Sequence, residues 1–503
     1  MDRRMVMARK KMLAYKWRHL LLVPALAAGL MAVPSRSQAD VLGDLFSVFE
    51  PSDDQNTGAA QHPKILTKFG GEYKQVGLNE YILDIGLRLA AVSSMKTLPW
   101  HFTVLNTPVI NAFALPGGYV YITRGLLALA NNEAEVAGVL AHEIGHVTAR
   151  HGAARQSRAT GIGLLGALAG ILTGSEAVQQ IGQQLGGLYV ASYSREQEYE
   201  ADQLGVKYLG LAGYPREAMA DFLKRLQAQS DYAAKASGNG GGSQFDFFAS
   251  HPQTEDRVAR AEDAAQKAHD DLDRDYDRKR YLSHIDKMLY GDDPKEGIIK
   301  GREFLHPVLK FKFTAPEEFQ LINSTEAVYG QDRNGNVMVF DLGKKERGVA
   351  PASYLKNVWL TKLKPTKVQT FDVYGASAAG TGVTVDQNGG RIYLSAAVVE
   401  FTDGQVARFM FQTKSMTSAL QQKITASVKS FQPISKDEAG DVRPLEIQIK
   451  AVKAGETTEG LAKSMAGEAP DKKALLLLLN PELEGKPPVK GEEYKILRYG
   501  EAS

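Results

Sequence analysis

The sequence of 503 residues contains no cysteine. This absence excludes a disulfide framework, a thiolate zinc site, a cysteine nucleophile and a lipid anchor on a leading cysteine. Any metal site must therefore be built from histidine, aspartate and glutamate. The remaining composition, with 44% hydrophobic and 23% charged residues, is that of an ordinary globular protein. The length allows two to four domains, each able to bury its own core.

Long hydrophobic runs are also scarce. Near the N-terminus, seven basic residues precede the apolar run Leu20–Val33, which contains Pro24 and is followed by Ser37-Gln38-Ala39. The run is shorter than the ~20 residues that a membrane-spanning helix needs. A basic start, a short apolar run and small residues at the end are typical of a cleavable secretory signal. We therefore predict a signal peptide over residues 1–39, in preference to an uncleaved anchor.

The mature protein has no excess of positive charge. The whole chain has 60 Lys and Arg against 58 Asp and Glu, but eight of the basic residues and one acidic residue lie in residues 1–39. The remainder has 52 basic and 57 acidic residues, so its composition offers no argument for nucleic-acid binding. Export without disulfides or a second span indicates a bacterial periplasm. We expect neither a nucleic-acid partner nor a transmembrane span in the mature chain.

Turn residues and changes of pattern divide the mature chain into several parts. The first mature residues are polar and rich in Gly, Asp and Gln, which predicts a loosely held leader. Helical periodicity follows, with a strand near residue 103 and a hairpin across Pro116-Gly117-Gly118. Strand-like runs and one amphipathic helix then indicate an antiparallel sheet. We predict an α+β multidomain protein with four successive mature parts: a leader (40–67), a mainly helical domain (68–285), a mixed α/β domain (300–433) and a small βααβ domain (444–500).

The strongest chemical signal is the run AHEIGH at residues 141–146. It lies in a predicted helix that Asn132 caps and that has an apolar face. Two histidines four residues apart on a helix can bind one metal ion, so His142 and His146 are candidate zinc ligands. Glu143 is placed to hold the attacking water rather than the metal.

A catalytic zinc site needs a third protein ligand, which the acidic run SREQEYEAD at residues 194–202 can supply from a second helix. Glu198 and Asp202 share one face of this helix at i,i+4. Glu198 can therefore bind the metal while Asp202 accepts a ring N–H from a ligating histidine. Glu196 and Glu200 remain alternatives by spacing, and an acidic helix is often simply solvated.

Four blocks of sequence resemble the zinc metallopeptidases that include the CAAX prenyl endopeptidases, HtpX and the periplasmic BepA-like proteases. The blocks occur in the family's order: NAFALPGG (111–118), the histidine helix ending in RH (150–151), EYEAD (198–202) and SHP (250–252), followed by Arg257. The chain lacks the multiple spans of the membrane-embedded members, so it resembles the soluble exported branch.

This resemblance implies a gluzincin-like fold and endopeptidase activity with one zinc ion per chain. It implies Glu198 as the third ligand beside His142 and His146. Glu143 is then the general base that takes a proton from the attacking water and passes it to the leaving amine. His151, which lies off the ligand face, is assigned a structural role.

His251 has three interpretations, of which the resemblance implies the first two. It donates to the developing oxyanion, it moves onto the zinc and keeps the enzyme latent, or it is a structural histidine before Pro252. Arg257 either supports the same oxyanion or is an ordinary arginine of a helix surface.

An edge strand is expected from Asn111 to Pro116, against which an extended peptide can add as a further strand. The candidate substrate-binding residues are Asn111, Ala112, Phe113 and Ala114. Recognition of this kind favours unfolded or misassembled chains.

The closing segment resembles LysM, a small carbohydrate-binding module for peptidoglycan. The resemblance rests on VKAGET (452–457), NPEL (480–483) and the segment from Gly491 to Ile496. It implies peptidoglycan as a further candidate partner. The domain at 300–433 resembles PsbP and Mog-one-type domains through His306-Pro307 and the phenylalanines that follow, and no function is inferred from it.

Together these observations predict an exported zinc-dependent endopeptidase that acts on unfolded or misassembled envelope proteins. The alternative is a periplasmic chaperone or a cell-wall-associated binding protein that uses the same domain to grip its clients. Glu143 argues against this alternative, because a protein that only binds has no need of a general base.

Overall fold

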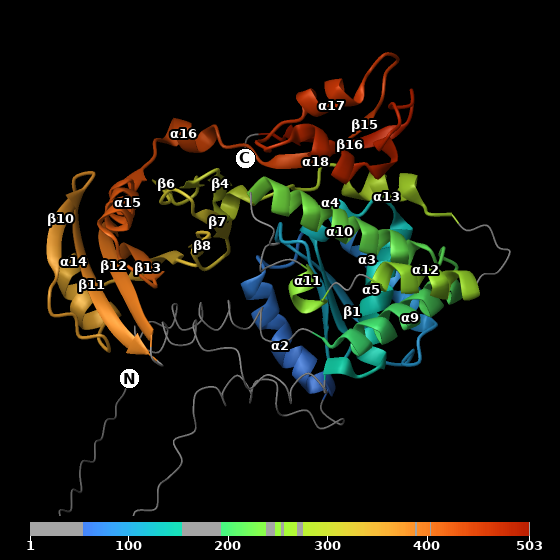
Figure 1. Ribbon diagram of the computed structural model, residues 1–503, viewed down its shortest axis with the longest axis horizontal. Helices are drawn as coiled ribbons and strands as arrows, with labels where there is room; N and C mark the ends of the chain where they lie inside the picture. Colours follow the sequence, from blue (N-terminus) through green and yellow to red (C-terminus); the bar gives the residue numbers. More distant parts are fainter. Residues whose placement is uncertain are drawn as a thin grey trace, which may run out of the picture.

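The computed structural model describes residues 54–152, 193–237, 247–252, 256–268, 275–387, 390–402 and 404–501. The chain is a multidomain protein of helices and several sheets, in agreement with the predicted mixed class (Figure 1). The predicted signal peptide and the first residues of the predicted leader lie outside the described residues. Among the helices that the structure describes, none combines the length and the apolar character needed to cross a membrane.

The helical part, residues 54–285, surrounds a three-stranded sheet. Its elements are α2 (Asp54–Lys68), α3 (Leu78–Ala91), β1 (His101–Leu105), β2 (Ala112–Leu115), β3 (Tyr119–Thr123), α4 (Arg124–Leu129), α5 (Glu133–Thr148), α9 (Arg195–Leu211), α10 (Ala218–Ser237), α11 (Phe247–Ser250), α12 (Arg257–Lys267) and α13 (Arg278–Ile285). The strand order is β1-β3-β2, with β1 parallel and β2 antiparallel to β3. The predicted hairpin joins β2 to β3 through Gly117 and Gly118, both at positive φ. β2 is therefore an edge strand.

Helix α2 corrects one prediction made from the sequence. A loosely held leader is predicted up to residue 67, yet Asp54–Lys68 is helical. Ile65 and Phe69 pack in one apolar cluster with Tyr121 of β3, and His62 Nδ1 lies 2.9 Å from the Tyr121 hydroxyl. Packing against the sheet thus outweighs the weak helical preference of this polar segment, since tertiary contacts commonly override local propensity.

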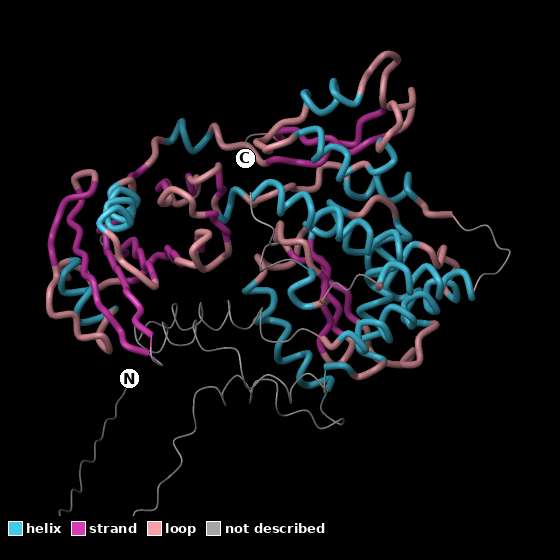
Figure 2. The backbone as a smooth tube through the Cα atoms, in the orientation of Figure 1, coloured by secondary structure: helices cyan, strands magenta, loops and turns pink. Residues whose placement is uncertain are grey.

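The β-rich part, residues 298–433, contains two antiparallel sheets (Figure 2). Its elements are β4 (Ile298–Lys300), β5 (Glu303–His306), β6 (Phe311–Thr314), β7 (Gln320–Asn323), β8 (Val328–Gln331), β9 (Val337–Lys344), α14 (Pro351–Tyr354), β10 (Gln369–Val373), β11 (Ala376–Gln387), β12 (Gly390–Thr402), β13 (Gln405–Thr413), α15 (Ser418–Lys429) and β14 (Gln432–Pro433). The strand orders are β10-β11-β12-β13-β9-β8-β7 and β14-β6-β5-β4. Phenylalanines from both sheets and one face of α15 form the core between them. The predicted antiparallel sheet is therefore present.

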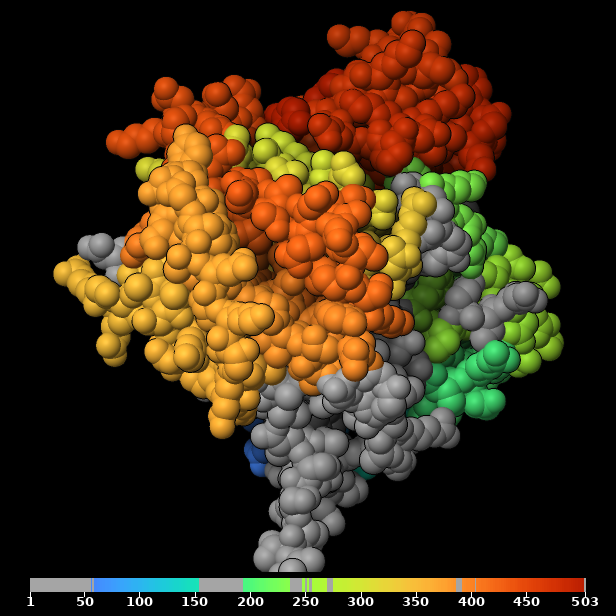
Figure 3. All heavy atoms as spheres, turned by 60° about the vertical axis from the view of Figure 1, so that its left-hand side comes forward, coloured from blue at the N-terminus to red at the C-terminus, as the bar shows by residue number. Residues whose placement is uncertain are grey.

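A short helix, α16 (Lys436–Gly440), leads to the C-terminal module, residues 445–499. The module has the predicted order of β15 (Leu445–Ala451), α17 (Thr458–Ser464), α18 (Lys472–Leu479) and β16 (Glu493–Tyr499), with β15 and β16 antiparallel. Its apolar core is continuous with that of the helical part. Two backbone hydrogen bonds join Ile447 to the segment after α13: Lys287 N–H to Ile447 O at 2.7 Å and Ile447 N–H to Met288 O at 2.8 Å. Figure 3 shows the module, in red, lying across the top of the other parts.

A fully buried lysine anchors the C-terminal module on α4. Lys495 of β16 has 0% exposure, and its Nζ donates to the carbonyls of Ala128 at 3.0 Å and Ala130 at 2.7 Å. These carbonyls belong to the C-terminal turn of α4, where helical carbonyls lack partners within the helix. Burial lowers the pKa of Lys495 to about 7, although the nearby Glu135 carboxylate partly offsets this effect. The module therefore completes the hydrogen bonding of α4.

We expect Lys495→Met to lower the free energy of unfolding by about 1–3 kcal/mol, because it leaves buried carbonyls without a donor. The pKa of Lys495 in the folded protein, about 7, lies below the ~10.4 of an unfolded lysine. The unfolded chain therefore binds more protons between these pH values, and the unfolding free energy of the wild type rises with pH there. Lys495→Met lacks the titrating amine, so its unfolding free energy should not show this rise with pH.

Chemical denaturation at pH 7 and pH 9 measures both effects, with Lys490→Met as a control. Lys490 is exposed in the same module, so its replacement should change stability by less than about 0.5 kcal/mol. Equal stability of the two variants would contradict the assigned role of Lys495.

Candidate metal centre

Helix α5 carries the two histidines of the HExxH motif. Its first turn is capped as predicted: the Glu135 N–H donates to the Asn132 side-chain oxygen at 2.8 Å. The helix is buried from Glu133 to His146, and His142 and His146 are each only 2% exposed. The two rings therefore project from one helix face into the interior.

Helix α9 supplies the carboxylate that faces them. Ser194 and Gln197 form a capping box at its N-terminus. A methyl group at Gly145 of α5 would lie only 3.0 Å from the Ala201 carbonyl oxygen of α9. The glycine thus permits the close approach of the two helices that places Glu198 opposite the histidines.

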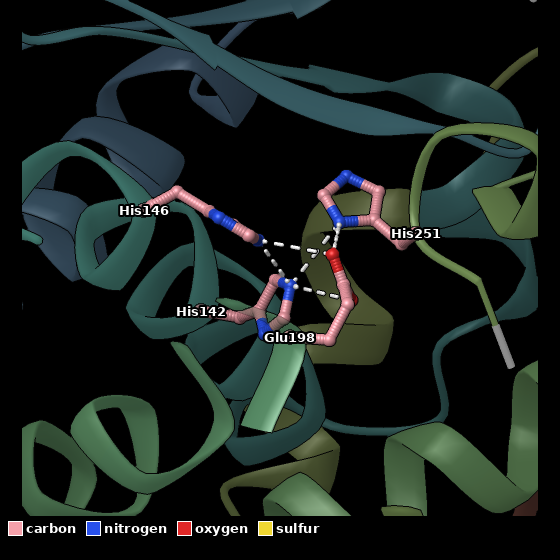
Figure 4. Close-up of side chains that lie close together, drawn as sticks. All are labelled: His142, His146, Glu198 and His251. Atoms are coloured by element: carbon pink, nitrogen blue, oxygen red, sulfur yellow. Dashed lines mark hydrogen bonds and ion pairs between the residues drawn. The ribbon is translucent and has the colours of Figure 1, made fainter. Parts of the chain in front are cut away.

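Four ligand-type side chains converge on one point: His142, His146, Glu198 and His251 (Figure 4). One ligand atom of each lies within 4.8 Å of the others. The two histidine Nε2 atoms of α5 are 2.9 Å apart, and His251 Nδ1 lies 3.2 Å from His142 Nε2 and 3.1 Å from Glu198 Oε1. Glu198 Oε1 lies 3.5 Å from His146 Nε2. Donors bonded to one tetrahedral zinc ion lie ~3.3 Å apart, so these nitrogen and oxygen donors fit zinc in type and spacing.

Asp202 contacts His142 of this cluster, and Arg257 contacts Glu198. Asp202 Oδ1 lies 2.9 Å from His142 Nδ1, as expected for the partner of a ligating histidine. Arg257, which is fully buried, donates to both oxygens of Asp202 at 2.8 Å and approaches Glu198 Oε2 at 2.8 Å. Burial tends to raise the pKa of Asp202, but the Arg257 guanidinium outweighs it and the pKa lies below its usual value. Arg257 is therefore a buried counter-ion and not the surface residue of one sequence interpretation.

His146 has a partner that the sequence interpretation missed. His151 Nδ1 lies 2.9 Å from His146 Nδ1, and His151 Nε2 lies 3.2 Å from a Glu200 carboxylate oxygen. The ring of Tyr193 stacks on His146 at 3.7 Å between centroids. The polypeptide turns back after α5, with Arg150 at positive φ, and this turn brings His151 to the far side of the ring. Helical spacing could not reveal this contact, because His151 lies beyond the end of α5.

Glu143, the predicted base, lies beside this cluster, and His251 belongs to it. Glu143 is fully buried, and its Oε1 is 3.5 Å from His251 Nε2. The His251 backbone N–H bonds to the Phe247 carbonyl at 3.0 Å, and the two rings stack at 4.3 Å. His251 is therefore fixed with Nδ1 toward the predicted ligands and Nε2 toward Glu143.

The predicted substrate residues occupy the edge of the small sheet. Ala112, Phe113 and Ala114 belong to β2, and among the described residues this strand pairs only with β3. Asn111 precedes the strand and is buried. α5 and β2 pack against each other, so the strand lies beside the helix that carries the histidines.

A buried cluster of two helical histidines and one carboxylate from a second helix defines the zinc site of a metallopeptidase with the HExxH motif. Residues 78–265 match Peptidase family M48, and this segment contains His142, His146, Glu198 and His251.

Three curated proteins are similar to the chain over this region. It is 36% identical over 221 residues to the putative beta-barrel assembly-enhancing protease of Vibrio cholerae, covering 42% of each chain. It is 33% identical over 197 residues to the beta-barrel assembly-enhancing protease of Escherichia coli, covering 37% of this chain and 39% of the relative. It is 31% identical over 189 residues to the mitochondrial metalloendopeptidase OMA1 of Schizosaccharomyces pombe, covering 36% of this chain and 52% of the relative. The chain thus spans about half the length of these relatives or less.

We expect Arg257→Met to destabilise the metal-free protein by about 3–5 kcal/mol, because it leaves two buried carboxylates without their counter-ion. Denaturation in the presence of a chelator measures this effect without the contribution of bound metal. The matched control is Arg260→Met on the same helix, whose ion pair with Asp256 is largely exposed and should contribute less than about 1 kcal/mol. Similar losses in the two variants would show that Arg257 does not act as a buried counter-ion.

We expect His151→Phe to weaken zinc binding about 10- to 100-fold, since the hydrogen-bonding partner of a ligating histidine orients the ring and raises its basicity. Competition with a chromogenic chelator gives the affinity. His284→Phe is the control: this ring stacks on Tyr81 at 3.9 Å and lies outside the cluster. Unchanged affinity in His151→Phe would mean that the His146 contact has no effect on the metal.

Proposed function

We propose that this protein is an exported zinc-dependent endopeptidase that cleaves unfolded or misassembled envelope proteins. The observation that carries the proposal is the convergence of His142, His146 and Glu198 within 4.8 Å, with Glu143 buried beside them on the helix of the two histidines. The names of the bacterial relatives, which refer to beta-barrel assembly, and of the mitochondrial metalloendopeptidase support a role in protein quality control.

His142, His146 and Glu198 are the residues that would hold the zinc ion, which supplies a Lewis acid for the scissile carbonyl and an activated water. Glu143 moves the protons. Its carboxylate accepts a proton from the attacking water and returns it to the leaving amine nitrogen. Asp202 keeps Nδ1 of His142 protonated, so that Nε2 faces the ligand cluster.

Substrate recognition is assigned to β2. An extended peptide can pair with the free side of this edge strand through backbone hydrogen bonds, which depend little on sequence. Folded proteins rarely offer such a segment, and unfolded chains do. This preference fits a protease that removes misassembled proteins.

His251 is assigned as a latch on the resting enzyme. Its Nδ1 lies 3.1 Å from Glu198 Oε1 and 3.2 Å from His142 Nε2, a position suited to a fourth ligand. A fourth protein ligand closes the position that a catalytic zinc site keeps for water. Movement of His251 would then open this position and leave its ring able to support the oxyanion.

The proposed location is the periplasm, to which a cleavable signal peptide over residues 1–39 would direct the protein. The C-terminal module is proposed to be LysM-like, and peptidoglycan is its candidate ligand. The alternative function is a chaperone or binding protein that grips clients without cutting them. It differs from the peptidase in having no use for Glu143.

The decisive experiment compares casein cleavage by the purified protein, its chelator-stripped form and Glu143→Gln, with zinc measured in each. We expect one zinc ion per chain, and loss of cleavage by about 10²- to 10⁴-fold in the variant that lacks the general base. The control is Glu196→Gln, an exposed acidic residue of the same helix as Glu198, which should retain activity and zinc.

If the protein binds zinc but does not cleave casein, the variant His251→Ala distinguishes a latched endopeptidase from a binding protein. Recovered cleavage would establish the latch and the endopeptidase together. If His251→Ala binds casein but still does not cleave it, the endopeptidase is refuted and the binding protein is supported.

A further inference from the structure

A cavity of about 860 Å³ lies where the three parts of the chain meet. The helical part contributes Pro108–Ile110 and the α10 residues Gln229 and Ala233, and the β-rich part contributes residues 298–301 and 321–323. The C-terminal module contributes Leu445, Gly467, Glu468 and Tyr499. We call this space the interdomain cleft. Its volume lies within the range of sites that hold drug-sized ligands, which is also the size of a short peptide segment.

Two edge strands form one wall of the interdomain cleft. β4 ends the four-stranded sheet and β7 ends the seven-stranded sheet, and the two strands lie near each other (Figure 1). Nearly all of their residues line the space. Edge strands present backbone groups to which a further strand can add. Asp292 already accepts the Ile299 N–H of β4 at 2.9 Å, so β7 is the edge that we assign to an incoming strand.

The opposite wall continues directly into the proposed substrate strand. Pro108–Ile110 line the cleft, and Asn111 and β2 follow at once. At ~3.3 Å per residue, a peptide paired along β2 reaches the cleft within about two further residues. This wall is held firmly: Thr123 Oγ1 bonds to the Val109 carbonyl at 2.5 Å, and a methyl group at Gly125 would lie 2.1 Å from the Pro108 carbonyl oxygen.

The chemistry of the lining suits a polypeptide of varied sequence. Apolar side chains such as Ile298, Ile322 and Leu445 are only half-buried, and Tyr499 is 54% exposed at the rim. The charged side chains in the lining carry both signs: Lys300 and Arg443 against Asp292, Asp441 and Glu468. A site of one charge sign would select a phosphate or a polycation, whereas this mixture tolerates many sequences.

We propose that the interdomain cleft binds an extended segment of the polypeptide substrate, continuing the chain that pairs with β2. This inference rests on the proposed function, because it takes β2 as the substrate strand. It gives the β-rich part and the C-terminal module a shared role, since both extend the recognition surface from the metal centre to a second edge strand. Long unfolded chains then bind more tightly than short peptides.

The test fills the cleft from one side. Ala233→Trp places a large ring into it from α10, and Ala228→Trp places the same ring on the exposed surface of the same helix as the matched control. Both substitutions are made in the Glu143→Gln protein, and binding of fluorescently labelled casein is followed by anisotropy. We expect Ala233→Trp to weaken binding about tenfold, which corresponds to ~1.4 kcal/mol, and Ala228→Trp to leave it unchanged. Lys300→Trp, from the opposite wall, is the second blocking variant if Ala233→Trp does not fold.

Cleavage assays in the Glu143-intact protein separate this inference from the proposed function. A higher KM for casein in Ala233→Trp, with an unchanged rate on a six-residue peptide cut from casein, supports the cleft. Equal casein binding by the two tryptophan variants, or none by the Glu143→Gln protein, overturns the cleft whatever the activity. If Ala233→Trp weakens casein binding but the wild type does not cut casein, the proposed endopeptidase activity is refuted and substrate binding in the cleft is supported.

Discussion

The architecture of the metal centre depends on one buried ion network. Arg257 approaches Glu198 and Asp202 at 2.8 Å, and Asp202 in turn meets His142 at 2.9 Å. Two carboxylates brought into the protein interior without a cation would be strongly destabilising. A single guanidinium from α12 contacts both of them and offsets part of their negative charge. These contacts therefore join α5, α9 and α12 in the arrangement that brings the ligand atoms together.

The parts of this site that could be predicted from sequence are those set by the geometry of single helices. The i,i+4 spacing places His142 beside His146 and Glu198 beside Asp202, and the Asn132 cap marks the start of α5. Strand-like runs likewise predicted β6, β9, β10, β12 and β13 of the β-rich part, whereas the long strand β11 was not predicted. Short edge strands such as β4 and β7 went unnoticed, because three or four residues carry too little pattern.

Other features depend on contacts between distant elements, which no local pattern contains. His151 reaches His146 only through the turn after α5, and Arg257 bonds to Asp202, which lies 55 residues away in the sequence. Helix α2 forms because its apolar residues meet the β1–β3 sheet. The orientation of His251 also depends on a contact, because its ring stacks on that of Phe247. In each case the residue type was visible and its neighbours were not.

The buried Lys495 ties folding of the helical part to synthesis of the whole chain. Its partner Ala128 lies 367 residues earlier, and contacts of such long sequence separation form late. During synthesis the carbonyls at the end of α4 must wait until β16 emerges, and α4 lies directly before the helix that carries the HExxH motif. In a nascent chain, the helix with the HExxH motif therefore follows an α4 whose terminal carbonyls lack their lysine donor. The end of α4 is complete only when β16 is in place, so a chain that ends before residue 495 leaves these carbonyls without their donor.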